Sequence, residues 1–412
     1  MKSFLSLVLV SLIGFSLAQS LPEAPAADVQ AFVAQAQRGG RVTLRSGIYR
    51  LDQPLVLSNP VELVGAGSDK TVLASRAEGQ VVRFNSTGKS SATGLAFEHL
   101  GAAQAYVVYI QAGEVTLTDV AVSGAVRDAT NRQGGSGIIV WNNSKLTLNK
   151  SSVFKNQLEG IAALDQSQLV ISDSDISENE GSGVTLYDSS TMQIVNSLLE
   201  KNGASGIEIL NKSKLSVEKC DILQNAEFGI FVRDVASVAA KDNGINSNAY
   251  SGILARDQAQ VNLENNDILG NKESGIFYLG SATGVIRSNL IEKNTYSGIK
   301  VSEKARPQIE NNMVRSNYEF GLVVDKDAVV TVRQNTFDSN GYSGILARDN
   351  VQAILERNLL QNNGEHGIFF VGNAGGRAQG NECKQNKFTD LYLEKTSQTT
   401  LGENACKVER QP

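Results

Sequence analysis

Two stretches decide the fold: SGILARDQAQVNLENNDILGN at residues 251–271 and SGIKVSEKARPQIENNMVRSN at residues 297–317. Both belong to a series of eleven glycines, each 23 residues after the last, that runs without insertion or deletion from Gly137 to Gly367. An asparagine follows each of these glycines after 19 positions, from Asn156 to Asn386. A fixed period of this kind is typical of repeat proteins in which one repeat forms one structural unit.

The residues between these two columns predict β-structure. Apolar side chains alternate with polar ones after each glycine and again at two later places in the repeat, which predicts three short strands per repeat. Such strands cannot bury their apolar side within one repeat, so successive repeats stack with equivalent strands parallel and about 4.8 Å apart. No helical periodicity and no leucine-rich consensus is present. The sequence therefore predicts a parallel β-helix of 23-residue rungs.

The asparagines are predicted to be structural. A carboxamide both donates and accepts, so stacked copies bond each other and the turn backbone, which would otherwise be buried without partners. A second such column has Ser151, Ser174, Ser197 and Cys220 in its early rungs, followed by Asn243, Asn266, Asn289, Asn312, Asn335, Asn358, Asn381 and Asn404.

The ends of the chain differ from the repeat. Residues 1–18 are predicted to be a signal peptide cleaved after Ala18, which implies a secreted or periplasmic protein. Residues 19–38 are the lead-in and a short capping helix, residues 39–136 irregular early coils, and residues 137–412 the regular rungs. Cys383 and Cys406 lie 23 residues apart, on neighbouring rungs, and are predicted to form a disulfide. Cys220 is expected to be buried, and His99 to lie at the surface or in a turn.

The composition excludes some classes of function. Lys and Arg number 38 against 43 Asp and Glu, a formal charge of −5, which weighs against a nucleic-acid binder. Two histidines and three cysteines leave little material for a metal site, so no metal and no cofactor is predicted. After the leader, no apolar stretch approaches the length of a transmembrane helix.

From Gly39 onward, the rungs quoted above resemble the right-handed parallel β-helix repeats of the pectin lyase-like superfamily, and residues 39–51 (GGRVTLRSGIYRL) are similar to the first coil of many secreted members. The resemblance implies an all-β, single-stranded right-handed parallel β-helix, a solenoid of 23-residue rungs with a short N-terminal capping helix. The superfamily contains polysaccharide lyases, polygalacturonases, epimerases, tailspikes, adhesins and NosD-like periplasmic assembly factors.

The catalytic motifs of that superfamily do not carry over. The chain has no Asp-Asp pair and no Asn-Thr-Asp, and Glu365-His366-Gly367 only half matches the Gly-His-Gly of polygalacturonases. A glycosidase of that type needs its pair of carboxylates. No catalytic residue is therefore predicted, and whether the protein is an enzyme stays open.

One outward column alternates glutamate with aromatic residues. Two positions before each repeat glycine stand Glu227, Tyr250, Glu273, Tyr296, Glu319, Tyr342 and Glu365, with Phe388 in the next rung. Rings stack on sugars and carboxylates accept hydrogen bonds from hydroxyls, so the members from Tyr250 to Glu365 are predicted to bind a glycan. The alternative is that duplication propagated the pattern, because residues 250–294 and 342–386 align at an offset of four rungs.

A second outward stripe follows the first strand. Trp141, Leu164, Tyr187 and Leu210 are consecutive apolar residues of one column, and the neighbouring outward column holds Phe231, Leu254, Phe277, Leu346 and Phe369. Trp141 and Tyr187 are predicted to contact a ligand, as are Arg256 and Arg348, which suit an anionic sugar. The aspartates after these arginines are better explained as turn caps. This apolar stripe is expected to be covered by the loop at 124–136, to bury a partner, or to form a groove.

These features yield three hypotheses of function. The first is an exported β-helix that binds polysaccharide along the face of the first strand, with processing left open. The second is a non-catalytic structural protein that interacts with a cell-envelope component. The third is a NosD-like periplasmic assembly factor, for which metal ligands are scarce.

Overall fold

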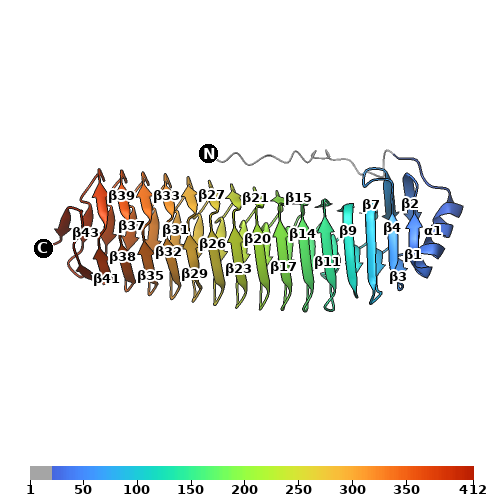
Figure 1. Ribbon diagram of the computed structural model, residues 1–412, viewed down its shortest axis with the longest axis horizontal. Helices are drawn as coiled ribbons and strands as arrows, with labels where there is room; N and C mark the ends of the chain where they lie inside the picture. The colour runs from blue at the N-terminus through green and yellow to red at the C-terminus, as the bar shows by residue number, and fades with distance from the viewer. Residues whose placement is uncertain (1–20) are drawn as a thin grey trace.

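The computed structural model describes residues 21–412; the predicted signal peptide lies outside the described residues. Figure 1 shows an elongated solenoid whose strands stack along the long axis, with helix α1 (Ala26–Arg38) against its N-terminal end. The predicted β-helix and its capping helix are confirmed. Each regular rung contributes three strands, and all the strand pairs between rungs are parallel.

Within the described residues the strands form two sheets. The first strands of the rungs make up the smaller sheet, and we call its outward side the strand-one face. Its members are β3 (Leu55–Leu57), β6 (Gly79–Phe84), β8 (Ala105–Ile110), β10 (Ile138–Val140), β13 (Ile161–Ala163), β16 (Val184–Leu186), β19 (Ile207–Ile209), β22 (Ile230–Val232), β25 (Ile253–Ala255), β28 (Ile276–Tyr278), β31 (Ile299–Val301), β34 (Leu322–Val324), β37 (Ile345–Ala347), β40 (Ile368–Phe370), β43 (Leu391–Leu393) and β45 (Val408–Arg410).

The larger sheet holds the second and third strands, which the two long strands β7 (Lys89–His99) and β9 (Glu114–Ser123) join into one. The second strands are β1 (Gly40–Thr43), β4 (Val61–Val64), β11 (Lys145–Asn149), β14 (Gln168–Ser172), β17 (Thr191–Val195), β20 (Lys214–Glu218), β23 (Ser237–Lys241), β26 (Gln260–Glu264), β29 (Thr283–Arg287), β32 (Arg306–Glu310), β35 (Val329–Arg333), β38 (Gln352–Glu356), β41 (Gly375–Gln379) and β44 (Gln398–Leu401). The third strands are β2 (Gly47–Leu51), β5 (Thr71–Ser75), β12 (Ser152–Phe154), β15 (Asp175–Ser177), β18 (Leu198–Glu200), β21 (Asp221–Leu223), β24 (Gly244–Asn246), β27 (Asp267–Leu269), β30 (Leu290–Glu292), β33 (Met313–Arg315), β36 (Thr336–Asp338), β39 (Leu359–Gln361) and β42 (Glu382–Lys384).

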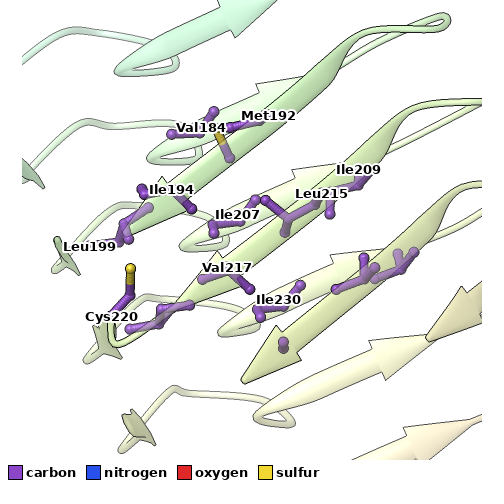
Figure 2. Close-up of a cluster of buried hydrophobic side chains, with 14 of the residues drawn as sticks. Val184, Met192, Ile194, Leu199, Ile207, Ile209, Leu215, Val217, Cys220 and Ile230 are labelled. Atoms are coloured by element: carbon purple, nitrogen blue, oxygen red, sulfur yellow. The ribbon is translucent and has the colours of Figure 1, made fainter. Parts of the chain in front are cut away.

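The core consists of apolar columns that run along the rod. Figure 2 shows Val184, Ile207 and Ile230 as successive members of one column; the first two are also Cα partners in the β16–β19 pair. All three side chains are 0% exposed. A fully buried aliphatic side chain stabilises a fold by about 1.5–3 kcal/mol. In the regular rungs the 23-residue period therefore stacks inward apolar residues on one another along the rod.

The predicted asparagine ladders are confirmed. The Nδ2 of Asn294 donates to the Oδ1 of Asn317 at 3.0 Å and to the carbonyl of Ile268 at 3.1 Å. Its own Oδ1 accepts from the backbone N–H and from the Nδ2 of Asn271, both at 3.0 Å. The side chain is 0% exposed, and its amide both donates and accepts within the turn. In the second ladder, Cys220 is buried and donates its backbone N–H to Asn243 at 3.0 Å.

The turn after each first strand has its own ladder. Asp257 has a positive φ of 60°, and its Oδ2 accepts the N–H of Asp234 at 3.2 Å. Asp349 accepts the N–H of Lys326 at 3.0 Å in the same way. The expectation that these aspartates cap turns is confirmed.

Helix α1 caps the N-terminal end of the rod, and a disulfide links the last two rungs at the other end. Phe32 and Ala36 of α1 are buried, and the ring of Phe32 lies 5.6 Å from that of Tyr49 on the first coil. At the other end, Cys383 and Cys406 form the predicted disulfide, with their Cα atoms 4.8 Å apart.

The expectation for His99 is wrong. Its side chain is only 4% exposed, and its Nε2 lies 3.3 Å from the carbonyl oxygen of Ala77. Burial lowers the pKa of His99. In the early coils the paired residues are not 23 apart (Glu62 pairs with Ser91), so the rung position of His99 was not readable from the repeat.

Asn294→Ala should destabilise the protein strongly, because the buried backbone N–H of Asn271 loses its acceptor and the carbonyl of Ile268 loses its side-chain donor. We expect the free energy of unfolding to fall by about 2–4 kcal/mol, measured by denaturant unfolding. The control is Gln308→Ala on the exposed side of β32, which should change it by less than about 0.5 kcal/mol. Equal effects of the two substitutions would contradict a structural role for the ladder.

Candidate functional site

The Glu/Tyr column forms a continuous strip beside the first strands. Each member donates its backbone N–H to the carbonyl of the member one rung earlier, as Tyr296 does to Glu273 at 3.1 Å and Glu319 to Tyr296 at 3.0 Å. The side chains of Tyr250, Tyr296 and Tyr342 are 43%, 49% and 41% exposed, whereas the glutamates between them are half-buried. The strip therefore presents rings to solvent at every second rung.

A hollow of about 350 Å³ lies between this strip and the outward residues of β28, β31, β34 and β37. It brings together four of the predicted residues, namely Glu273, Tyr296, Glu319 and Arg348. The remaining lining residues are Ser274, Phe277, Ser297, Lys300, Phe320, Val323 and Leu346.

The hollow combines rings with charges of both signs. The ammonium of Lys300 lies 4.9 Å from the centre of the Phe277 ring, a cation–π contact. Arg348 pairs with Asp325 at 3.0 Å, and Asp325 itself is buried. An apolar floor with a few charged groups at its rim is the usual composition of a small-molecule or sugar site.

The other predicted residues lie outside the hollow. Tyr342 packs edge-on against Phe320, with ring centres 5.2 Å apart, and so borders the hollow without lining it. Tyr250 packs against Phe228 at 5.2 Å, one rung before Glu273. Glu365 accepts a bond from Ser343 at 3.4 Å.

Arg256, Trp141 and Tyr187 are placed elsewhere. Arg256 pairs with its chain neighbour Asp257 at 3.3 Å. Trp141 is 40% exposed near the N-terminal end of the face, where its ring lies 6.3 Å from that of Tyr109. Tyr187 belongs to a second cluster, described below.

The sequence-based prediction missed Lys300, Phe277 and Phe320 as members of one site. Two signals were available. Lys300 is the one cation in an otherwise mostly apolar outward column of residues 139 to 392, and Phe320 stands where most rungs have serine before the repeat glycine. Neither signal told which rungs would be hollowed.

The outward apolar stripe is largely covered by side chains of its own face. Leu254, Val323 and Leu346 are 8%, 5% and 7% exposed, and Phe277 is half-buried. The loop at 124–136 pairs with the start of β8, where Val126 and Ala105 exchange backbone hydrogen bonds. The stripe thus forms the apolar surface of the strand-one face, and the hollow is a depression in that surface.

The second cluster lies on the same face, around β16 and β19. The hydroxyl of Tyr187 donates to Glu159 at 3.2 Å, and the hydroxyl of Ser136 donates to the other oxygen of Glu159 at 2.7 Å. Glu208 points outward from β19, and its carboxylate lies 3.8 Å from the guanidinium of Arg233. Burial raises the pKa of Glu208, the charges of Glu159 and Glu227 raise it further, and Arg233 opposes them. Burial likewise raises the pKa of Tyr187.

Residues 21–412 contain neither a cluster of metal ligands nor a helix that could span a membrane. No three His, Cys, Asp or Glu side chains in this range are grouped closely enough to hold a metal ion. No helix in the same range is both long and apolar enough to cross a membrane.

The fold and the 23-residue repeat together define the protein family to which the chain belongs. The family model "Right handed beta helix region" matches residues 93–222, 136–284 and 251–406, and the chain belongs to this family. The match also confirms the right-handed β-helix that the resemblance to pectin lyase-like proteins implied. No curated protein matches the sequence.

Several solved structures share this fold at low sequence identity. The Dettilon tailspike protein is 14% identical with a TM-score of 0.51, over 85% of this chain and 65% of the tailspike. The catalytic unit of an α-1,3-glucanase from Streptomyces thermodiastaticus is 15% identical with a TM-score of 0.52, over 96% of this chain and 70% of that unit. The A-module of the mannuronan C-5 epimerase AlgE6 from Azotobacter vinelandii is 16% identical with a TM-score of 0.47, over 96% and 98%. The chain thus spans less than two thirds of the tailspike.

The burial of Glu208 predicts a pH-dependent stability. Because its pKa is raised in the folded protein, the ionised carboxylate destabilises the fold at neutral pH, and this cost disappears as the pH falls and the group becomes protonated. Glu208→Gln should therefore unfold at a higher temperature than the wild type at pH 7, with the difference shrinking toward pH 4. Thermal unfolding at a series of pH values measures this.

The control for this prediction is Glu264→Gln, an exposed carboxylate on the larger sheet, which should change the free energy of unfolding by less than about 0.5 kcal/mol. A Glu208→Gln variant that melts below the wild type at pH 7 would show that the pair with Arg233 outweighs the cost of burial.

Proposed function

We propose that the strand-one face binds a polysaccharide, with the hollow around Tyr296 and Lys300 as the principal contact. The observation that carries the proposal is the combination in one hollow of exposed rings, two cations and two carboxylates above an apolar floor. Sugar rings offer an apolar face and many hydroxyls, and this lining complements both.

The shape of the face supports a polymer rather than a small ligand. The Glu/Tyr strip continues past the hollow in both directions, with Tyr250 before it and Tyr342 after it, each exposed by about two fifths. Rings recur every second rung, about 10 Å apart. A long chain would meet one ring after another, whereas a monosaccharide would use the hollow alone.

The comparisons support a polysaccharide partner at the level of fold. Two proteins with TM-scores above 0.5 are a tailspike and an α-1,3-glucanase. The glucanase name states a polysaccharide substrate, and we take polysaccharide as the class of ligand without choosing the sugar. We also propose that the protein acts outside the cytoplasm, since residues 1–18 read as a leader and the disulfide Cys383–Cys406 is typical of oxidising compartments.

Binding can be tested by affinity electrophoresis with α-1,3-glucan, alginate and pectate. Tyr296→Ala and Lys300→Ala should each weaken binding to whichever polymer the wild type retains by about tenfold, because each removes one of the hollow's contacts worth about 1.4 kcal/mol. The control is Ile354→Ala, a partly exposed apolar residue on the larger sheet, which should leave binding unchanged.

If Tyr296→Ala and Lys300→Ala both bind the polymer as tightly as the wild type, the hollow is not the binding site. If the wild type retains none of the polymers but binds a cell-envelope protein, the second hypothesis from the sequence would replace the proposal.

A further inference from the structure

A second place on the strand-one face has the chemistry of a reaction centre. Glu208 stands in the outward column that elsewhere holds Ile139, Ala162, Thr185, Phe231, Leu254, Phe277, Lys300, Val323, Leu346, Phe369 and Tyr392, and it is the one carboxylate in that column. Its side chain is 24% exposed, so it is largely desolvated and still reachable from solvent. Replacing an apolar residue by a desolvated carboxylate costs stability, and such local departures from a repeat mark functional positions.

The side chains around Glu208 lie across the strands. Tyr187 follows β16, whereas Glu159 precedes β13, so the 3.2 Å hydrogen bond between them spans the width of the face. Thr185, the Cα partner of Glu208 on the adjacent strand, is only 1% exposed. Its hydroxyl has no hydrogen-bond partner within the described residues, although it is an outward-facing side chain. A buried polar group without a partner is costly, and this one lies on the strand next to Glu208.

Arg233 is the cation next to Glu208. Its guanidinium lies 3.8 Å from Glu208 and 5.9 Å from the centre of the Phe231 ring. At 3.8 Å the pair is too long for a hydrogen bond, and the Nε of Arg233 is buried without a partner among the residues described. Two groups of this cluster, the Thr185 hydroxyl and the Arg233 Nε, are therefore without hydrogen-bond partners among the described residues.

The two main carboxylates have different surroundings. Glu159 accepts hydrogen bonds from two hydroxyls, those of Ser136 and Tyr187. Glu208 is desolvated by its neighbours, which raises its pKa, although Arg233 and a hydrogen bond with the side chain of Ser182 oppose this shift. Pairs of carboxyl groups in contrasting environments are the arrangement that divides acid and base roles in one site. Their backbones are two strand spacings apart along the axis, about 10 Å, and the charge of Glu159 acts on the carboxyl group of Glu208.

We propose that Glu208 and Glu159 hydrolyse a glycosidic bond of a polysaccharide bound across β16 and β19. Protonated Glu208 gives its proton to the glycosidic oxygen as the bond from that oxygen to the anomeric carbon breaks. A water molecule attacks the anomeric carbon and loses a proton to the carboxylate of Glu159, so the products are two shorter chains, one with a new reducing end. Tyr187 positions Glu159 by its hydrogen bond. The inference rests on the proposed polysaccharide binding by the same face.

The charged and titratable groups that face Glu208 are Glu159, Tyr187, Glu227 and Arg233. The glutamates favour the protonated form of Glu208, and Arg233 favours the ionised form. Cleavage should therefore decline at alkaline pH, as Glu208 loses the proton that it must donate.

The test incubates the full-length mature protein with α-1,3-glucan, alginate and pectate, and measures new reducing ends together with the absorbance of unsaturated sugars. Glu208→Gln and Glu159→Gln should each lower the rate of reducing-end formation by at least about 100-fold, since each removes a proton-transfer group. Both should retain polymer binding within about threefold. Tyr187→Phe should lower the rate and shift its pH profile, and Glu264→Gln on the larger sheet serves as the unaffected control.

The outcomes separate this inference from the proposed function. No new reducing ends from a polymer that the protein binds, an unsaturated product, or an unchanged rate in Glu208→Gln would each overturn the hydrolytic pair and leave polysaccharide binding intact. Unaltered binding in Tyr296→Ala and Lys300→Ala would overturn the hollow and leave the pair intact. A stability measurement needs no substrate. Glu208→Leu, which restores the apolar residue type of the column, should melt at or above the wild-type temperature at pH 7. A large drop in melting temperature would instead show that Glu208 has a purely structural role in its ion pair with Arg233.

Discussion

The structure depends on one constraint: equivalent strands of successive rungs stack in parallel, one strand spacing apart along the rod. Neighbouring rungs exchange backbone hydrogen bonds in both directions: Ile138 donates its N–H to Gly160 of the next rung, and Tyr296 donates to Glu273 of the preceding one. No rung has a core of its own. Stacking fixes the repeat length, because one inserted residue would move a strand's side chains from the core to the surface. It also makes the asparagine ladders necessary, since the bends leave backbone groups that no strand can pair. Asn294 shows how this need is met at one bend, because its side chain makes four hydrogen bonds there.

The same constraint separates positions that must repeat from positions that are free to vary. Inward residues such as Ile253 and Ile276 are fixed by their neighbours above and below, and both are fully buried. Outward residues of the first strands meet only side chains of the same face, so Lys300 or Glu208 can replace an apolar residue without opening the core. Function on such a rod is therefore expected where an outward column departs from its own consensus.

Features set by the backbone period could be predicted from the sequence. The disulfide Cys383–Cys406 follows from two cysteines 23 residues apart, and the asparagine columns follow from the same spacing. The column of Tyr296 and its neighbouring glutamates was also readable. The hollow was not, because it depends on how far side chains lean across the face, as the ammonium of Lys300 does over Phe277. His99 was misplaced for a related reason, since the early coils have no constant spacing.

The bond between Tyr187 and Glu159 shows why the second cluster was also hidden. The two residues are 28 positions apart, five more than one rung, so the repeat alone does not make them neighbours. Both side chains are long, and the outward residues of β13 and β16, Ala162 and Thr185, are small and only 3% and 1% exposed. Large side chains there would lift the bridge away from the sheet and uncouple Glu159 from the rung of Glu208. The small residues of β13 and β16 therefore belong to the candidate reaction centre as much as its charged groups do. The sequence signal for that centre is a pair of small outward residues, Ala162 and Thr185, followed in the same column by the isolated carboxylate of Glu208.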